Sequence, residues 1–351
     1  MMMKKKKTVA VVFGGVSPEY EVSLMSSYSV IKAVNTNKYN LIMLGITRDG
    51  QWYRFTGDIE DILSDKWLDN DKYLTKAFIP PMRCGGILEI TDDKNTLTPV
   101  DIIFPVLHGE NGEDGTIQGL CELAGLSVVG SGSAASALCM DKYRAQKLVA
   151  LEGISVTKSI YYEQKPTATE LKQRVIDLKL PLFVKPVKAG SSIGVTMVED
   201  YLKLEEAVIL AFEYDDAVMI EEGIKGKEVG CSVIGNNKLI TGRINEIEVT
   251  KGFFDYNEKY TLASSKIHVP ARIDEETEKR IQEVGKKVFK ILGCKGYARI
   301  DMFLKEDGDV IFNEANTIPG FTVFSQFPGM MKGIGMKYPQ IVDKLIELGL
   351  E

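Results

Sequence analysis

Several signatures that assign a chain to a common class of protein are missing from these 351 residues. The five cysteines are an odd number and form no CxxC pair, which argues against a zinc ribbon and against a secreted disulfide framework. No run of about 18 apolar residues occurs, so a membrane-spanning helix is not expected. The GxGxxG dinucleotide fingerprint and the GxxxxGK(S/T) phosphate loop are both absent. A protein of the reducing cytoplasm is therefore expected.

The charged residues exclude a second group of partners. Lysine and arginine number 43, aspartate and glutamate number 49, and the two signs are mixed along the chain, with a net charge of -6. No basic stripe marks a nucleic-acid surface. The lysines of Met1–Lys7 resemble the start of a signal peptide, but the apolar run Val9–Phe13 is short and breaks at Gly14-Gly15. It is therefore predicted to be a first strand.

Length and an apolar content of 44% predict two or three compact domains. Up to about Gly130, short apolar strands alternate with helical stretches, a pattern typical of a doubly wound parallel sheet. The segments in this pattern are Val9–Phe13, Val22–Val34, Leu41–Ile46, Ile102–Leu107 and Ile117–Ala124. The polar stretch 49–98 is predicted to be an irregular elaboration of that domain.

The second half of the chain reads differently. Pro181–Lys185 and Val195–Val198 flank a glycine-rich stretch, which predicts antiparallel strands around a tight loop. Another strand is expected from Ala217, and Asp274–Leu292 has helical spacing. The aromatic and charged segment Gly252–Tyr260 has no clear period and predicts a long loop, either an active-site lid or a plain connection.

A predicted hairpin near the end of the chain carries the strongest chemical signal. Asp307-Gly308 stands between two alternating apolar runs and is a favoured two-residue turn. If this turn sets the register, Asp301 faces Glu314, Arg299 faces Asn316, and all four side chains share one face. Two carboxylates and an amide oxygen suit magnesium shared with nucleotide phosphates. An ordinary solvated face is the alternative.

Two further motifs suit a nucleotide. Lys185 lies in a strand that runs into a loop with Gly190 and Ser191, whose N–H and hydroxyl groups can turn toward a polyphosphate. A plain hairpin turn is the alternative. A second strand ends in Glu221, with Glu228 further on, where acceptors would suit an adenine amino group and ribose hydroxyls. A surface strand end is the alternative there.

Two loops follow strands of the predicted parallel sheet, where such sheets present ligand-binding loops. One contains Ser17 and Glu19, and the other contains His108, Glu113 and Asp114. The sequence leaves open whether His108 binds a ligand or only caps a backbone group.

The motifs FGGxSxExxVS, HGxxGEDG, MDK, KPxxxGSS(I)G, EE...E, DYNEKY, RID, NEAN and PGFT, in this order, resemble the D-alanyl-D-alanine ligase family of the ATP-grasp fold. The match spans Val9 to about Leu348, and stretches such as Ser136–Lys142 are most similar to the vancomycin-resistance branch that makes D-alanyl-D-serine. The resemblance implies an α/β (α+β) ATP-grasp fold with an N-terminal doubly wound parallel-sheet domain. It also implies a Rossmann-like substrate domain at 1–130, a central ATP-grasp subdomain at 131–224, and a C-terminal subdomain at 225–351 with the lid loop and metal hairpin.

The resemblance further implies roles for individual residues. Residues that would bind ATP are Lys142, Lys185, Ser192, Glu221, Ile224, Glu228, Lys259 and Phe303. Residues that would ligate two magnesium ions, with manganese as the alternative ion, are Asp301, Glu314 and Asn316. Residues that would serve the reaction itself are Glu19, Ser191, Tyr260, Arg299 and Gly320. Residues that would contact the two amino acids are His108, Ser325 and Gln326.

The implied reaction transfers a phosphoryl group from ATP to the carboxylate of D-alanine, and the amine of a second D-amino acid then attacks the acyl phosphate. Magnesium and the lysines would neutralise the transferring group. Arg299 and the Gly320 amide would stabilise the tetrahedral oxyanion. Closure of the loop around Lys259 and Tyr260 would exclude water. The product would serve peptidoglycan synthesis or vancomycin resistance, and a homodimer is the family expectation, without nucleic-acid or membrane partners.

The acceptor stays open between D-serine and D-alanine. Asp255–Tyr260 resembles the amine-using branches rather than the D-lactate-using branch, which predicts a peptide product. After Ser325, ordinary members carry an apolar residue and resistance ligases carry arginine, whereas this chain has Gln326. An amide can hydrogen-bond a serine hydroxyl, so the prediction leans to D-serine.

Two other functions compete with this one. Another ATP-grasp ligase, acting on a different carboxylate and amine, would keep the metal hairpin but not Ser17 and Glu19 together with Asp255–Tyr260. A nucleotide-binding regulatory protein without catalysis would show damage at the ligands or at Arg299, and none is visible.

Overall fold

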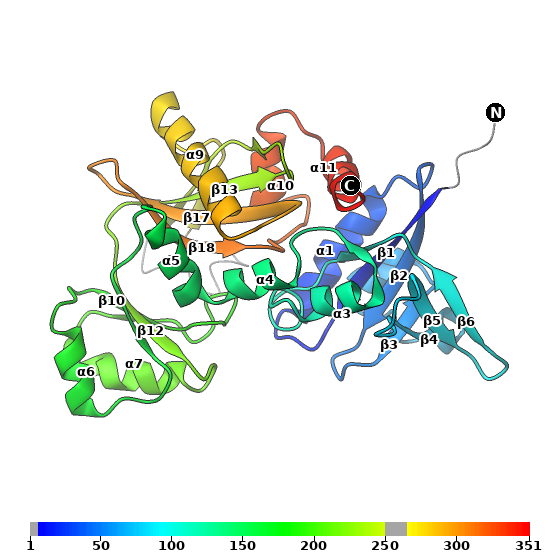
Figure 1. The fold of residues 1–351 in the computed structure, drawn as a ribbon, viewed down its shortest axis with the longest axis horizontal. Coiled ribbons are helices and arrows are strands. Elements are labelled where there is room, and N and C mark those ends of the chain that lie inside the picture. Colours follow the sequence, from blue (N-terminus) through cyan, green and yellow to red (C-terminus); the bar gives the residue numbers. More distant parts are fainter. Residues whose placement is uncertain (1–5, 250–264) are drawn as a thin grey trace.

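The computed structural model describes residues 6–249 and 265–351, and these residues form three β-sheets that follow one another along the chain (Figure 1). The first sheet has the order β6-β5-β4-β3-β2-β1-β7-β8. Its parallel strands are β1 (Lys7–Gly14), β2 (Tyr39–Ile46), β7 (Ile102–Pro105) and β8 (Ser127–Val128). Its antiparallel strands are β3 (Trp52–Phe55), β4 (Leu74–Phe78), β5 (Gly86–Ile90) and β6 (Asn95–Pro99).

Helices cover both faces of the parallel half of this sheet, as the doubly wound prediction requires. Val9 and Val11 of β1 share a core with α1 (Tyr20–Ala33) and α11 (Tyr338–Gly349). Ala10 and Val12 face α3 (Thr116–Ala124) on the other side. Because β1 is buried on both faces, its sequence is a continuous apolar run.

The prediction of an irregular stretch at 49–98 was wrong. This stretch contains β3 to β6, with the short helices α2 (Ile59–Leu63) and η1 (Asp71–Tyr73) between them. Many side chains of these strands are partly or fully exposed. An antiparallel sheet with one face in water needs polar residues, and that composition was mistaken for irregular structure.

The second sheet has the order β11-β10-β12-β9 and is antiparallel throughout. Its strands are β9 (Ser159–Tyr162), β10 (Leu182–Pro186), β11 (Thr196–Val198) and β12 (Val218–Glu222), with α6 (Ala168–Val175), η2 (Tyr201–Lys203) and α7 (Leu204–Ala211) between them. The predicted antiparallel strands around the glycine loop are confirmed as β10 and β11.

The third sheet has the order β16-β15-β13-β17-β18, and β14 (Ile240–Thr241) pairs with β13. Its other strands are β13 (Lys227–Ile234), β15 (Asn245–Val249), β16 (Ser265–His268), β17 (Tyr297–Leu304) and β18 (Val310–Asn316). The predicted helix is confirmed as α9 (Glu275–Ile291), which begins after the capping residue Asp274. A Cβ added at Gly285 would lie 2.7 Å from the sulfur of Cys231, so α9 lies directly on β13.

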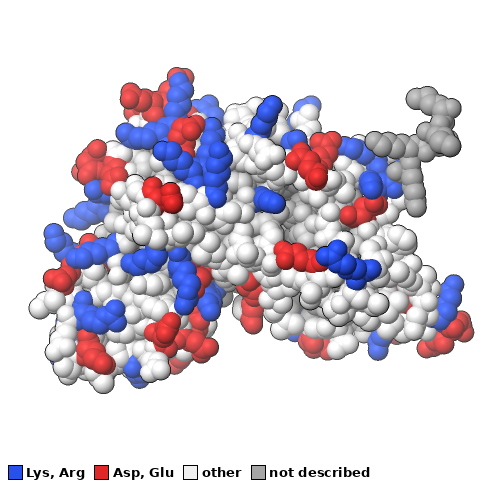
Figure 2. Space-filling view, viewed as in Figure 1, with Lys and Arg blue, Asp and Glu red and all other residues white. Residues whose placement is uncertain are grey.

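The end of the chain returns to the first sheet. Phe321, Phe327 and Leu345 share one core with Val9 and Phe104, and α11 lies beside α1 (Figure 1). The connection from β18 to α10 (Gln326–Lys332) therefore passes between the third sheet and the first. On the face drawn in Figure 2, acidic and basic side chains are interspersed. Among the described residues, no helix is long and apolar enough to span a membrane.

Candidate active site

The four polar residues of the hairpin pair as predicted. Asp301 lies opposite Glu314, and Arg299 lies opposite Asn316. The alternate residues of β17 are buried in the core beneath α9, and they are Ala298, Ile300, Met302 and Leu304. Because side chains alternate along a strand, Arg299 and Asp301 point to the opposite face of the sheet.

The length of the turn was predicted wrongly, but a bulge in β18 restores the predicted strand register. The N–H of Lys305 donates to the carbonyl of Asp309 at 2.9 Å, so three residues, not two, form the loop. Met302 then lies opposite Phe312, and the register shifts at the next residue, which leaves Asn313 as a bulge. One extra residue in the loop and one in the strand cancel, so the carboxylate pair still meets.

Hydrogen bonds order this polar face. Arg299 Nε lies 2.7 Å from Asp301 Oδ1, and its Nη2 lies 2.7 Å from Oδ2. Asn316 Nδ2 donates to Asp301 Oδ2 at 2.8 Å, and Lys142 Nζ lies 3.7 Å from Glu314 Oε2. Burial disfavours the Arg299 cation, but the charges of Asp301 and Glu314 outweigh it and raise its pKa. A fixed positive charge therefore stands beside the two carboxylates.

The donor set of this face fits a divalent cation shared with a nucleotide. Among the described residues, no cluster of three or more His, Cys, Asp or Glu side chains is placed to hold a metal ion. The protein here offers two carboxylates, Asp301 and Glu314, on adjacent strands, with the amide of Asn316 beside them. These are hard oxygen ligands, and phosphate oxygens would complete the shell around a magnesium ion.

Glu19 is enclosed by two loops that belong to different sheets. Its side chain is buried and accepts a hydrogen bond from the hydroxyl of Ser191. A Cβ added at Gly109, in the loop after β7, would lie 2.4 Å from Glu19 Oε2, and one at Gly190, in the β10–β11 loop, would lie 2.8 Å from it. Both glycines therefore lie close to the Glu19 carboxylate, and the two loops meet there.

The loop between β10 and β11 has the backbone of an anion site. Ser191 and Ser192 have φ values of +49° and +58°, and Gly194 has +71°. A left-handed conformation costs a residue other than glycine about 1–2 kcal/mol, and successive N–H groups in such turns form concavities that bind anions. Lys142 Nζ donates to the carbonyl of Ala189 in the same loop at 2.8 Å. The predicted phosphate loop and one predicted phosphate lysine are thus adjacent.

A second lysine of the predicted nucleotide site is paired with an acid. Lys185 and Glu221 are both buried and form an ion pair. Gln146 Nε2 donates to Glu221 Oε1 at 2.7 Å, and Lys185 Nζ lies 3.4 Å from the Oδ1 of Asn313, the bulged residue of β18. The other predicted nucleotide-binding residues in the described ranges lie along the chain between the second and third sheets. Ile224 follows β12, and Glu228 of β13 lies opposite Phe303 of β17.

The loop after β7 brings two further ionisable groups to the site. Burial lowers the pKa of His108, against the opposing charge of Glu19. Burial and the charge of Glu19 raise the pKa of Glu113 to about 8. No role was predicted for Glu113, although it lies in the same HGxxGEDG motif as His108.

The residues predicted for the acceptor lie near Gly320. Ser325 Oγ accepts from the N–H of Thr322 at 3.0 Å, and a Cβ added at Gly320 would lie 3.4 Å from it. Gln326 Oε1 accepts from Asn245 Nδ2 at 2.8 Å. Asn245 is fully buried, and its own Oδ1 has no partner among the described residues.

Asn245 belongs to a row of three residues on adjacent strands. Gly230 of β13 pairs with Asn245 on one side and with Asp301 on the other. A Cβ added at Gly230 would lie 2.4 Å from Asn245 Oδ1 and 3.3 Å from Asp301 Oδ1. Because Gly230 has no side chain, the amide of Asn245, which contacts Gln326, lies close to the polar face that carries Asp301. No motif in the sequence indicated Asn245.

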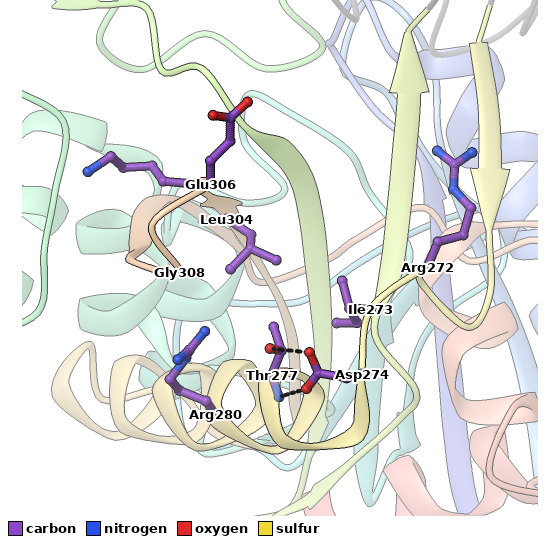
Figure 3. Close-up of a pocket in the computed structure, with 9 residues that line it drawn as sticks. Arg272, Ile273, Asp274, Thr277, Arg280, Leu304, Glu306 and Gly308 are labelled. Atoms are coloured by element: carbon purple, nitrogen blue, oxygen red, sulfur yellow. Dashed lines mark hydrogen bonds between the residues drawn. The ribbon is translucent and has the colours of Figure 1, made fainter.

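The predicted lid, with Lys259 and Tyr260, lies outside the described residues. The hollow drawn in Figure 3 is a different place. It has a volume of about 460 Å³ and lies between the start of α9 and the turn after β17, on the Leu304 side of that strand. That side is the face opposite Asp301, so the hollow takes no part in the site.

Most of the chain is similar to a known family of enzymes. Family models described as D-ala D-ala ligase N-terminus and C-terminus match residues 8–131 and 148–347. A D-alanine--D-alanine ligase of Caldicellulosiruptor bescii is 40% identical, covering 99% of this chain and 96% of its own length. The Vancomycin C-type resistance protein VanC2 of Enterococcus casseliflavus is 41% identical, covering 98% and 99%.

Solved structures agree. The VanG D-Ala:D-Ser ligase from Enterococcus faecalis has a TM-score of 0.92 and 53% identity, covering 98% of this chain and 100% of its own. The D-alanine-D-alanine ligase from Coxiella burnetii has a TM-score of 0.87 and 30% identity, covering 99% and 94%. The predicted ATP-grasp fold is therefore confirmed, and the chain belongs to the D-ala D-ala ligase family.

Proposed function

We propose that this ligase joins D-alanine to D-serine, using ATP and magnesium, for peptidoglycan precursors. The acceptor assignment is carried by the likeness to the VanG D-Ala:D-Ser ligase, which is 53% identical, against 30% for the D-alanine-D-alanine ligase structure from Coxiella burnetii. D-alanine as acceptor is the second candidate, because a D-alanine--D-alanine ligase is 40% identical over nearly the whole chain.

The geometry of Gln326 supports D-serine. Its Oε1 is taken by Asn245 Nδ2, so Nε2 is the end that remains to donate. A donor suits the hydroxyl oxygen of D-serine, whereas the methyl group of D-alanine offers no acceptor. A site with such a donor loses a hydrogen bond when D-alanine binds.

The residues of the site support the following division of labour. The Glu19 carboxylate would bind the ammonium group of the first D-amino acid, with Ser191 fixing its orientation. Lys142, Lys185 and the N–H groups of the β10–β11 loop would hold the phosphates. Asp301, Glu314 and Asn316 would hold magnesium, which when bound neutralises phosphate charge.

In this reaction the carboxylate oxygen of D-alanine attacks the terminal phosphorus of ATP, and ADP leaves. The neutral amine of the second amino acid then attacks the acyl carbon, and the tetrahedral adduct collapses by expelling phosphate as the nitrogen gives up a proton. Arg299 and the N–H of Gly320 would donate to the oxygen of that adduct. The units 1–130, 131–224 and 225–351 would supply the two amino-acid sites and the nucleotide site between them, and a homodimer stays a prediction.

The test is product analysis with competing acceptors. Purified protein is incubated with ATP, magnesium, D-alanine and an equal concentration of D-serine, and products are identified by mass. Predominant D-alanyl-D-serine is expected, and predominant D-alanyl-D-alanine would assign the second candidate. Phosphate release with L-alanine in place of both D-amino acids is the control and should stay at background. Phosphate release that is indifferent to D-amino acids would refute the ligase assignment.

A further inference from the structure

Both backbone polar groups of Ile318 are hydrogen-bonded to side chains of one loop of the first sheet, the loop after β7. Its N–H donates to Glu113 Oε1 at 3.2 Å, and its carbonyl lies 3.0 Å from His108 Nδ1. The other oxygen of Glu113 accepts from the N–H of Gly109 at 3.0 Å, which ties the carboxylate back to its own loop. Ile318 lies some two hundred residues further along the chain, between the metal-face residue Asn316 and α10.

The hydrogen bonds of His108 fix its tautomer. A carbonyl oxygen only accepts, so Nδ1 must carry the hydrogen that it donates to Ile318. Nε2 is then an acceptor, and the hydroxyl of Ser26 donates to it at 3.0 Å. Burial lowers the pKa of His108, which favours this neutral form. Both ring nitrogens therefore hydrogen-bond to protein groups, and the ring links Ile318 to Ser26.

Ser26 adds a third point of attachment. Its oxygen also accepts from the N–H of Phe321 at 3.4 Å. Ser26, His108 and Glu113 all belong to the first sheet and its helices, and together they hold both ends of the segment 318–321.

Gly320 lies between the held ends, and its N–H makes no hydrogen bond with any residue in the described ranges 6–249 and 265–351. A free N–H in a fixed segment is what an oxyanion donor requires, because such donors must stand about 2.7–3.1 Å from the developing charge. Its partner donor, Arg299, is fixed separately by Asp301 in the third sheet. The two donors can therefore act together only if the 318–321 segment has one position.

We propose that Ser26, His108 and Glu113 are positioning residues that hold the N–H of Gly320 where the tetrahedral adduct forms, an inference that rests on the ligase reaction proposed above. A displacement of about 1 Å at a catalytic group can cost on the order of 100-fold in rate. Loss of one attachment is expected to lower kcat on the order of 10-fold and to leave the KM for ATP within about twofold, since the three attachments come from the first sheet with its loops and helices.

Two neighbouring serines of α1 provide a matched test. Ser26 and Ser27 are both fully buried, but the Ser27 hydroxyl donates to Leu24 within its own helix at 3.0 Å. Ser26→Ala is expected to lose kcat on the order of 10-fold, whereas Ser27→Ala should keep kcat within about twofold, although each variant loses one buried hydroxyl. Initial rates of ADP release at saturating D-amino acids give kcat, and an ATP titration gives KM.

A second pair covers the case in which a buried serine variant folds poorly. Glu113→Gln leaves one oxygen to accept two N–H groups. Asp114→Asn instead changes a carboxylate that accepts from the nearby N–H groups of Asn111 and Thr116, at 2.8 and 3.0 Å. Glu113→Gln should lose kcat on the order of 10-fold with the ATP KM held, and Asp114→Asn should not.

The outcomes separate the two proposals. Equal kcat in Ser26→Ala and Ser27→Ala, or a wild-type kcat in Glu113→Gln, overturns the positioning role while ligation by the wild-type protein still stands. A parallel rise in the ATP KM also overturns it, because that would indicate general disturbance of the site. If the wild-type protein forms no dipeptide, the proposed function has failed first.

Discussion

Replacing Gln326 by leucine should move acceptor choice from D-serine toward D-alanine. The substitution keeps the approximate volume of the side chain and removes the Nε2 donor that would meet the serine hydroxyl. It also removes the oxygen that accepts from Asn245 Nδ2 at 2.8 Å. Two effects are therefore expected, one on selectivity and one on stability.

The sizes of both effects follow from the surroundings. A neutral hydrogen bond contributes about 0.5–1.5 kcal/mol net, so the D-serine to D-alanine ratio of kcat/KM should fall about 2- to 12-fold. Asn245 is fully buried and its Oδ1 already has no partner among the described residues. Losing the bond from Nδ2 as well should cost about 1–3 kcal/mol of folding free energy and lower the Tm.

The assay is the competition experiment with equal D-serine and D-alanine, read as the ratio of the two product masses. Gln282→Leu is the matched control. Gln282 lies on α9, outside the site, and its Nε2 donates to the carbonyl of Gly242 at 3.0 Å, so the substitution also removes one amide hydrogen bond. It should lower the Tm without changing the ratio. A Gln326→Leu protein that is active with an unchanged ratio would refute the role of this side chain in reading the acceptor.

Three further predictions test the catalytic face and the third sheet. Glu314→Gln should nearly abolish ADP release with an unchanged Tm, and wild-type activity would remove the basis of the metal site. Arg299→Met should lose on the order of 10²-fold in rate with unchanged ATP affinity, with lysine rescuing part; an unchanged rate with weaker ATP binding would make Arg299 a nucleotide contact. Burial raises the pKa of Glu246, but hydrogen bonds from Arg272 and Lys227 outweigh it and lower the pKa to about 2. The carboxylate therefore stabilises the fold above its unfolded pKa of about 4.5 and loses this effect as pH falls toward 2. Glu246→Gln should lower the free energy of unfolding by about 1–3 kcal/mol near neutral pH. In urea unfolding at falling pH, the difference in this free energy between variant and wild type should narrow below about pH 4.5. A difference that stays constant with pH would contradict the ion pair.

Local patterns predicted most of the elements near the site. The apolar run of β1, the helical period of α9 and the glycine-rich loop between β10 and β11 each report backbone conformation and burial directly. The stretch 49–98 was misread, because partly exposed strands have the same polar composition as loops. The hairpin pairs were right only because the three-residue turn and the bulge at Asn313 offset each other.

Family motifs in the sequence predicted which groups of the site would carry chemistry, namely its carboxylates, lysines and glycines. Their partners were decided by the tertiary structure. Ser191 with Glu19, His108 with Ile318, and Asn245 with Gln326 are contacts between different sheets or between strand and distant helix. Periodicity and turn chemistry act over a few residues, whereas these contacts depend on how three sheets pack and on the return of the chain end to the first core. No local pattern encodes that packing. The contact between Asn245 and Gln326 and the hydrogen bonds that hold residues 318–321 could therefore be identified only in the folded chain.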